Sequence, residues 1–423
     1  MSAKPTEGGS RRFITLKSTL LVGSILLAAC ASASPPVGAL TKLPAAYDHA
    51  DSAGGGAPEI EWWRGFGDPA LDALIAEALQ ANQDLAAGLA RVRQSRASVK
   101  TASASLFPQI SVGASASSNS DDGFGDVSGS ARANASYQLD LFGENRAGRK
   151  AAKAGLKGQI FNQRALELTV QSDVAFNYFS INALRSRLEV ALSNLEISER
   201  IYGIVRARYD AGDVSGFDMA SQEAQLANAR ARIPSLEQQL MSVETALAVL
   251  LGRMPQGFAA PAGDVLALDP PAVDPGLPSD LLLRRPDLLA AEASIAGADA
   301  DVMAARAAFF PSIDLSSGMT AALTGGASIV GSLAASLSAP IFSGGRLEGN
   351  LESTKARVDE RIAGYRQATL NALRDVDLSL RAVDTAGARE DQLEIAKEAA
   401  GRSLELAEIR YRAGADDLTS LLN

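Results

Sequence analysis

The chain has little of the chemistry that most enzymes use. Its 423 residues include one histidine, His49, and one cysteine, Cys30. A single histidine in a Gly/Pro-rich stretch leaves no Ser-His-Asp triad and no histidine-based metal cluster. The Gly-rich phosphate loop ending in Gly-Lys-Ser/Thr is also absent. Asp375 and Asp377 stand two apart on a helical stretch, so they face different ways and are expected to be solvated. We therefore predict no catalytic residues, no metal site and no cofactor.

Aromatic residues and positive charge are also scarce. Only 5% of the residues are aromatic, although 47% are hydrophobic. The apolar content therefore comes mostly from Ala and Leu, which favours thin, closely packed layers. The net charge is −9, and no basic stripe is visible, so a nucleic-acid partner is not expected.

Long apolar runs are confined to the N-terminus. Arg11, Arg12 and Lys17 precede an apolar segment, Thr19 to Ala29, and the stretch LAAC ends at Cys30. This arrangement predicts a signal peptide over residues 1–29. LAAC resembles a lipobox, in which cleavage precedes the cysteine and the thiol is acylated. The alternative is an ordinary secretory cleavage beside an incidental cysteine.

Without residues 1–29, which hold four basic groups and one acidic group, the net charge becomes −12. Residues 30–60 then form a lipid-anchored tether. No later stretch approaches the roughly 18 apolar residues of a membrane helix.

One pattern occurs twice along the chain. The stretches LFPQISVGAS and FFPSIDLSSG place the same Phe-Pro pair at Phe107 and at Phe310. Three further landmarks recur in the same order at nearly the same offset, which indicates two copies of one structural unit. We predict a first repeat over residues 61–253, a Pro-rich linker over 254–280 and a second repeat over 281–423.

Each repeat is expected to contain a β-hairpin. Proline cannot continue a helix, so Phe-Pro should end the helix that opens each repeat. From Val127 to Leu141, apolar or small residues alternate with polar ones, a period of two that predicts a strand with two unlike faces. Its partner begins near Ile110. The second repeat shows the same alternation around Leu333.

Long helices should follow the strands. Residues 147–211 contain no proline and would span on the order of 100 Å as one helix. Apolar positions step by three and four, which predicts a coiled-coil seam. The seam consists of Ile181, Leu184, Leu188, Ala191, Leu195, Tyr202, Val205 and Tyr209, with only Ser198 out of place. Gly212 and Gly414 then suit the left-handed residue that ends a helix.

The strands raise a closure problem. Four strands of membrane-spanning length cannot close a barrel with a usable lumen, and an open sheet edge is not tolerated in lipid. We therefore expect several copies to complete one barrel, with cyclic symmetry as the simplest arrangement.

The sequence resembles the TolC-like outer membrane factors, in particular their lipoprotein (NodT/OprM-like) branch. The resemblance covers nearly the whole mature chain. It rests on the stretches WWRGFGDP (residues 62–69), IPSLE (233–237) with LLGR (250–253), LRRPDL (283–288) and APIFSGG (339–345).

This resemblance implies a mainly α fold with a membrane β-barrel, in which two tandem repeats of coiled-coil helices and a hairpin form a trimeric tube. It implies a passive exit duct in the outer membrane that extends into the periplasm and exports drugs or other small molecules. The implied partners are two further copies, outer-membrane lipid, a periplasmic adaptor (membrane fusion) protein and an inner-membrane resistance–nodulation–division pump.

The resemblance also assigns site residues. The two Tyr-x-x-Gly turns, Tyr209 with Gly212 and Tyr411 with Gly414, would face the adaptor. The gate region would fall at Ser420 and Asn423. Because the family has a final helix after the second turn, the second repeat is expected to be C-terminally truncated.

Two other functions stay open at this point. The same kind of tube serves type I protein secretion. A lipid-anchored periplasmic coiled-coil scaffold would explain the helices and Cys30, but not fifteen residues of strict alternation.

Overall fold

The computed structural model describes most of the chain after residue 60. The described residues are 43–44, 46–47, 61–118, 127–264, 267–268, 270–271, 276–322 and 328–412. They belong to one compact unit, Thr41–Asn423. Several residues singled out above lie outside the described ranges: Cys30, His49, Gly414, Ser420 and Asn423.

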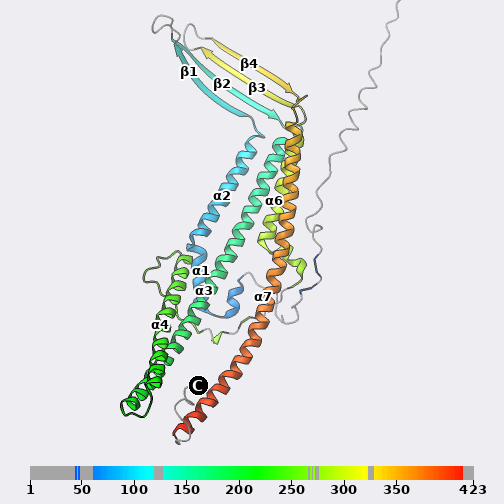
Figure 1. Ribbon diagram of the computed structural model, residues 1–423. Helices are drawn as coiled ribbons and strands as arrows, with labels where there is room; N and C mark the ends of the chain where they lie inside the picture. The colour runs from blue at the N-terminus through cyan, green and yellow to red at the C-terminus, as the bar shows by residue number, and fades with distance from the viewer. Residues whose placement is uncertain are drawn as a thin grey trace, which may run out of the picture. The chain divides into compact units, whose positions relative to one another are not determined.

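The fold is mainly α, with long helices and two β-hairpins, as predicted (Figure 1). In the first repeat the elements are η3 (Trp62–Phe66), α1 (Pro69–Ala81), α2 (Gln83–Ala104), β1 (Gln109–Ser118), β2 (Val127–Leu139), α3 (Glu144–Asp210) and α4 (Gly216–Leu250). In the second they are η5 (Pro278–Asp280), α5 (Leu281–Arg284), α6 (Pro286–Ala307), β3 (Ser312–Ala322), β4 (Ile329–Ser338) and α7 (Arg346–Arg412).

Phe-Pro marks the change from helix to strand in both repeats. Helices α2 and α6 are each 22 residues long, and each ends three residues before the phenylalanine. Strand β1 begins directly after Pro108, and β3 directly after Pro311. The proline ring cannot occupy a helix interior, so the chain extends at the same point of each repeat.

The two hairpins form a single antiparallel sheet in the order β1-β2-β3-β4. The first hairpin meets the second through β2 and β3, which belong to different repeats. One row of directly opposite residues crosses all four strands through Val112, Ala133, Met319 and Gly331. Strands β1 and β4 are the two edges of this sheet within the chain.

The register sorts the side chains by polarity, because opposite residues share a face and neighbours along a strand do not. One face is apolar at every position except Ser118 and Ser317. Its larger members are Ile110, Val112, Val127, Tyr137, Leu139, Ile313, Leu315, Met319, Ile329, Leu333 and Leu337. The other face is mostly polar and includes Ser111, Ser115, Ser130, Arg132, Asn134, Gln138, Asp314, Thr320, Ser332 and Ser336. The two-faced strands predicted from the alternation are confirmed.

Helices α3 and α7 contain 67 residues each, and they begin at equivalent points of the two repeats, shortly after β2 and β4. Helix α3 packs against α2, α4 and α6, whereas α7 packs against α6. The predicted seam of α3 is at least partly buried at every position apart from Tyr209, which is exposed. In the described part of the chain, no helix combines the length and the apolar character needed to cross a membrane.

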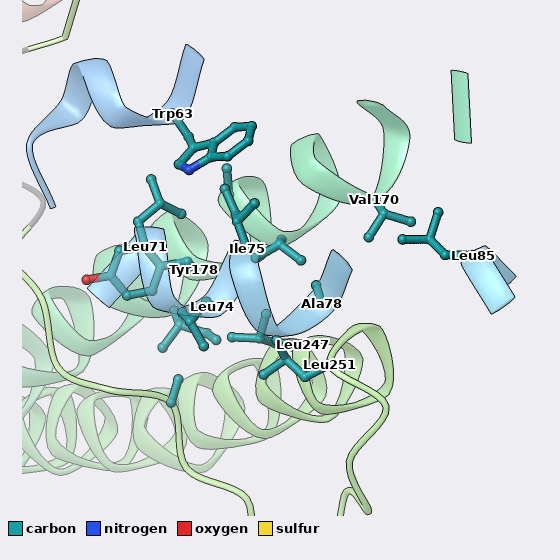
Figure 2. Close-up of a cluster of buried hydrophobic side chains, with 14 residues drawn as sticks. Trp63, Leu71, Leu74, Ile75, Ala78, Leu85, Val170, Tyr178, Leu247 and Leu251 are labelled. Atoms are coloured by element: carbon teal, nitrogen blue, oxygen red, sulfur yellow. The ribbon is translucent and has the colours of Figure 1, made fainter. Parts of the chain in front are cut away.

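A compact core lies where α1 packs onto α3 and α4 (Figure 2). Helix α1 buries Leu71, Leu74, Ile75 and Ala78, the spacing of one helical face. Trp63 covers one side of this face. Most of the remaining members come from α3 and α4 and include Val174, Tyr178, Ile181 and Leu247, and Leu85 of α2 also belongs to this core. This core joins the short N-terminal helices to the long ones.

Candidate functional site

The turn between α3 and α4 is a tightly bonded helical hairpin. Gly212 has a φ of 82°, which favours glycine. Its N–H donates to the carbonyl of Tyr209 at 2.9 Å, and the N–H of Asp213 donates to the carbonyl of Arg208 at 2.8 Å. These two bonds form a Schellman motif, which ends α3 at the predicted glycine.

The start of α4 is held just as firmly. Ser215 and Asp218 form a capping box in which each side chain bonds to the other residue's backbone N–H. The hydroxyl and the N–H of Ser215 both donate to the Asp218 carboxylate, and these bonds hold its pKa below the usual value. Tyr209 and Phe217 are exposed beside this turn. The turn therefore presents two aromatic rings on a fixed backbone.

The second predicted turn is described only in part. Tyr411 lies in the last turn of α7, which ends at Arg412. Its side chain and Gly414 lie outside the described residues, as do Ser420 and Asn423. The assignments made to these residues therefore stay predictions.

The sheet is the second candidate site. On its apolar face, Ile110, Val112, Leu333 and Leu337 are strongly exposed within a single chain. An apolar surface of this extent requires a non-aqueous or protein cover. The opposite face carries Arg132 and Asp314 among hydroxyl and amide side chains. Such a sheet can separate an apolar environment from an aqueous one.

Sequence reasoning missed an ion pair at the start of α3. The Asp140 carboxylate accepts hydrogen bonds from the backbone N–H groups of Asn145 and Arg146, at 3.0 and 2.9 Å. The Arg146 guanidinium also donates to this carboxylate through Nε at 3.0 Å. The only available signal was an aspartate that ends an alternating strand a few residues before a helix. These bonds tie the residue that follows β2 to the first turn of α3.

A buried polar chain supports the core near α1. Asp68 caps α1 by accepting from the N–H of Ala70, and it also accepts a 2.7 Å bond from the Tyr178 hydroxyl. Burial and this hydrogen bond raise the pKa of Tyr178 to about 12. One turn along α3, Asn182 accepts a bond from the N–H of Gly263. This chain is structural, because it ties the cap of α1 and the segment that follows α4 to the same side of α3.

The expectation of solvated carboxylates is wrong for Asp377, whose Oδ1 atom is buried, and only partly right for Asp375, whose side chain is 46% exposed. Both are partly buried. Asp375 lies 3.7 Å from the Arg285 guanidinium, which also pairs with Asp287 at 2.8 Å. Burial raises the pKa of Asp287, but the hydrogen bonds from Arg285 outweigh it and the pKa is lowered overall. This cluster joins α6 to α7, which explains why carboxylates occur on an inward-facing part of the helix.

Comparisons with known proteins agree with this geometry. The family model described as "Outer membrane efflux protein" matches residues 74–253 and 277–423. The pyoverdine export outer membrane protein OpmQ of Pseudomonas aeruginosa is 34% identical, and the alignment covers 96% of this chain and 89% of OpmQ. The toluene efflux pump outer membrane protein TtgF of Pseudomonas putida is 31% identical over 86% of this chain and 79% of TtgF.

Among solved structures, the open state of the MtrE outer membrane channel of Neisseria gonorrhoeae superposes with a TM-score of 0.78. It is 29% identical, and the match covers 92% of this chain and 89% of the MtrE chain. The predicted resemblance to TolC-like outer membrane factors is therefore confirmed. The chain belongs to the outer membrane efflux protein family, and it is a non-enzymatic outer membrane channel protein of efflux pumps.

Proposed function

We propose that three copies of this chain form one exit duct of a tripartite efflux pump. The observation that carries this proposal is the four-stranded sheet with unlike faces, in which β1 and β4 have no second neighbouring strand among the residues that the structure describes. Lipid does not tolerate an open edge, and four strands are too few to surround a lumen. Three sheets give twelve strands, with the apolar face toward lipid and the face bearing Arg132 and Asp314 toward the lumen.

Size and conductance test this proposal together. Protein extracted from outer membranes in mild detergent is expected to have the mass of three chains by light scattering. The same preparation should produce ion-conducting steps in planar bilayers. A monomer that produces no such steps would contradict the proposal.

The adaptor would bind at the α3–α4 turn through Tyr209 and Gly212, and at the corresponding Tyr411 and Gly414. Tyr209 and Gly212 support this proposal because they are exposed and held by backbone hydrogen bonds. They also lie at the end of the 67-residue helix α3 that is opposite to the sheet. A resistance–nodulation–division pump would sit beyond the adaptor. Ser420 and Asn423 are proposed to belong to the gate region.

A matched pair of glycine variants tests the turn. Gly212 and Gly257 both have positive φ, at 82° and 74°, and an added Cβ would contact nothing within 4 Å at either position. Each change to Ala should therefore strain the backbone by about 1 kcal/mol. Only Gly212→Ala should reduce co-purification of the adaptor. Equal retention of the adaptor by both variants would argue against this docking site.

The lipid anchor is proposed at Cys30, acylated after removal of residues 1–29. Because the sheet also holds the protein in the membrane, the anchor is partly redundant. Cys30→Ser should lose the mass of the lipid but stay in the membrane fraction. A fully soluble variant would show that the sheet does not insert.

Small molecules are the proposed cargo. The name of OpmQ refers to pyoverdine export and that of TtgF to toluene efflux, and neither refers to protein secretion, which favours efflux over type I protein secretion. Because relatives with different cargoes are similar to this chain along most of its length, we infer that the pump selects the cargo. Exchanging the pump while this duct is kept should change which compound is exported.

A further inference from the structure

The contact between the two hairpins contains an aromatic stack. Strands β2 and β3 pair so that Leu139 lies opposite Ile313. Three residues further along, at the helix end of the sheet, Phe142 stacks on Phe310 with ring centroids 4.7 Å apart and planes inclined by 13°. These two rings extend the same register beyond the last paired residues, because each lies three residues past the Leu139–Ile313 pair.

The outer edges of the sheet carry the same two residues, and neither takes part in a ring contact within the described part of the chain. Phe107 precedes β1 as Phe310 precedes β3, and Phe342 follows β4 as Phe142 follows β2. The rings in the stack are 45% and 48% exposed, whereas Phe107 is 65% exposed and Phe342 is 92% exposed. The repeat thus leaves one half of an aromatic pair at each edge.

We infer that the edges of neighbouring copies pair in the register that stacks Phe342 of one copy on Phe107 of the next. This inference rests on the proposed trimer, and it assigns the interface that holds the trimer together at the level of individual residues. In this register, β4 of one copy pairs with β1 of the next as β2 pairs with β3 within the chain. Phe342 then corresponds to Phe142, and Phe107 corresponds to Phe310. The resulting opposite pairs are Leu333 with Ala116, Ala335 with Ala114, and Leu337 with Val112, so that apolar residues meet apolar residues.

The aromatic pair is needed because the faces alone do not fix the register. A slip of two residues keeps every side chain on its own face. The registers inside the two hairpins differ by such a slip, when they are counted from the phenylalanine that follows the second strand. In the first, the residue opposite the start of β1 is Ser136, six residues before Phe142. In the second, the residue opposite the start of β3 is Ser338, four residues before Phe342. A stack of two rings selects one register among these alternatives.

Paired cysteines in the full-length protein measure the register directly. Ala335→Cys combined with Ala114→Cys should form a disulfide between copies after oxidation with copper phenanthroline in outer membranes. The same Ala335→Cys combined with Val112→Cys or Ala116→Cys samples the two slipped registers. Within one chain, Ala135 and Ser317 hold the equivalent positions and lie opposite each other. Cysteines at these two sites provide the control for oxidation, and the parent protein controls for Cys30.

The expected result is covalently linked trimer from Ala335→Cys/Ala114→Cys, at least fivefold above either slipped pair. Dominance of a slipped pair would overturn the register. Oxidation of the control without any linkage between copies, in protein that is trimeric by light scattering, would overturn pairing of these edges. Monomeric protein throughout would instead overturn the proposed function.

The stack itself is tested by heat dissociation of the trimer. Phe107→Ala and Phe342→Ala should each increase the dissociation rate roughly twofold to tenfold for each stack that is lost, which corresponds to the stabilisation that an aromatic pair provides. The double variant should be no faster than the quicker single variant. Ile341→Ala is the matched control, because Ile341 is 93% exposed and adjacent to Phe342 but outside the stack. Additive effects of the two phenylalanine changes would overturn the stack.

Discussion

The two repeats agree in the sheet and differ in the helices. Ile181 on α3 is fully buried, whereas Val383, which lies equally far from the start of α7, is 71% exposed. Helix α3 is covered by α2, α4 and α6, and the core around α1 adds to this cover. Two helices of equal length therefore need not be equally buried. An apolar seam shows which face of a helix can be buried, but the neighbouring helices determine whether that face is buried.

The sharpest test of this difference is a truncation at the two equivalent positions. Ile181→Ala should lower the free energy of unfolding by about 2–5 kcal/mol, because it leaves a cavity in the core. Val383→Ala should change it by less than about 0.5 kcal/mol, as at other exposed sites. Denaturant unfolding followed by circular dichroism compares the two. A loss for Val383→Ala as large as that for Ile181→Ala would show that other copies cover α7.

The sheet should respond alike in both repeats. Ala133→Arg in β2 and Leu337→Arg in β4 place a charge on the apolar face, which costs about 2–4 kcal/mol near the middle of a bilayer. Ser130→Arg and Ser336→Arg place the same charge on the polar face and should be tolerated. The amount of folded protein in outer membranes measures the difference. Equal damage on both faces would indicate a buried soluble sheet instead.

High pH should affect the first repeat more than the second. Tyr178 has a pKa near 12, and the equivalent residue on α7 is Leu380, which does not titrate. Because the folded protein holds the tyrosine proton more tightly than the unfolded chain, stability should fall as pH rises from about 10 to about 12. The loss should be about 2–3 kcal/mol. Tyr178→Phe should flatten this part of the pH profile. An unchanged profile would show that another group causes it.

The smallest difference is expected where each long helix starts. Asp140 accepts two backbone bonds and pairs with Arg146. The contacts of the Ser343 hydroxyl among the described residues are longer, 3.5 Å to the N–H of Leu347 and 3.4 Å to Glu348. Asp140→Ala should cost about 1–2 kcal/mol, and Ser343→Ala a few tenths. Thermal melting of the two variants under the same conditions distinguishes them. The reverse order would contradict the assigned caps.

Much of the fold could be predicted because its signals are local. Phe107-Pro108 and Phe310-Pro311 marked the start of two strands, and the alternation of polarity defined their faces. The turn at Gly212 was predicted from its position after a long seam. These features depend on proline, on strand period and on a left-handed glycine, and all three act within a few residues.

The missed features depend on contacts between distant residues. The bond between Tyr178 and Asp68 joins positions 110 residues apart, and no pattern around either residue indicates it. The pairing of β2 with β3 likewise unites two repeats, and alternation gives no preference for that partner. Arg285 is another example: it makes Asp375 part of a packed junction, although the residues around Asp375 are those of a solvated helix.

The connections of the sheet have a consequence for how the protein is assembled. Helices α2, α3, α6 and α7 all join the strands at one end (Figure 1). Insertion from the helix side therefore has to carry across the segment that connects the two strands of each hairpin, residues 119–126 in the first and 323–328 in the second. The first segment contains Asp121, Asp122 and Asp126, whereas the second contains no charged residue. Charges are costly to move through hydrocarbon, so the first hairpin carries the higher translocation barrier. We expect the second hairpin to cross first, so that the order of insertion is the reverse of the order of synthesis.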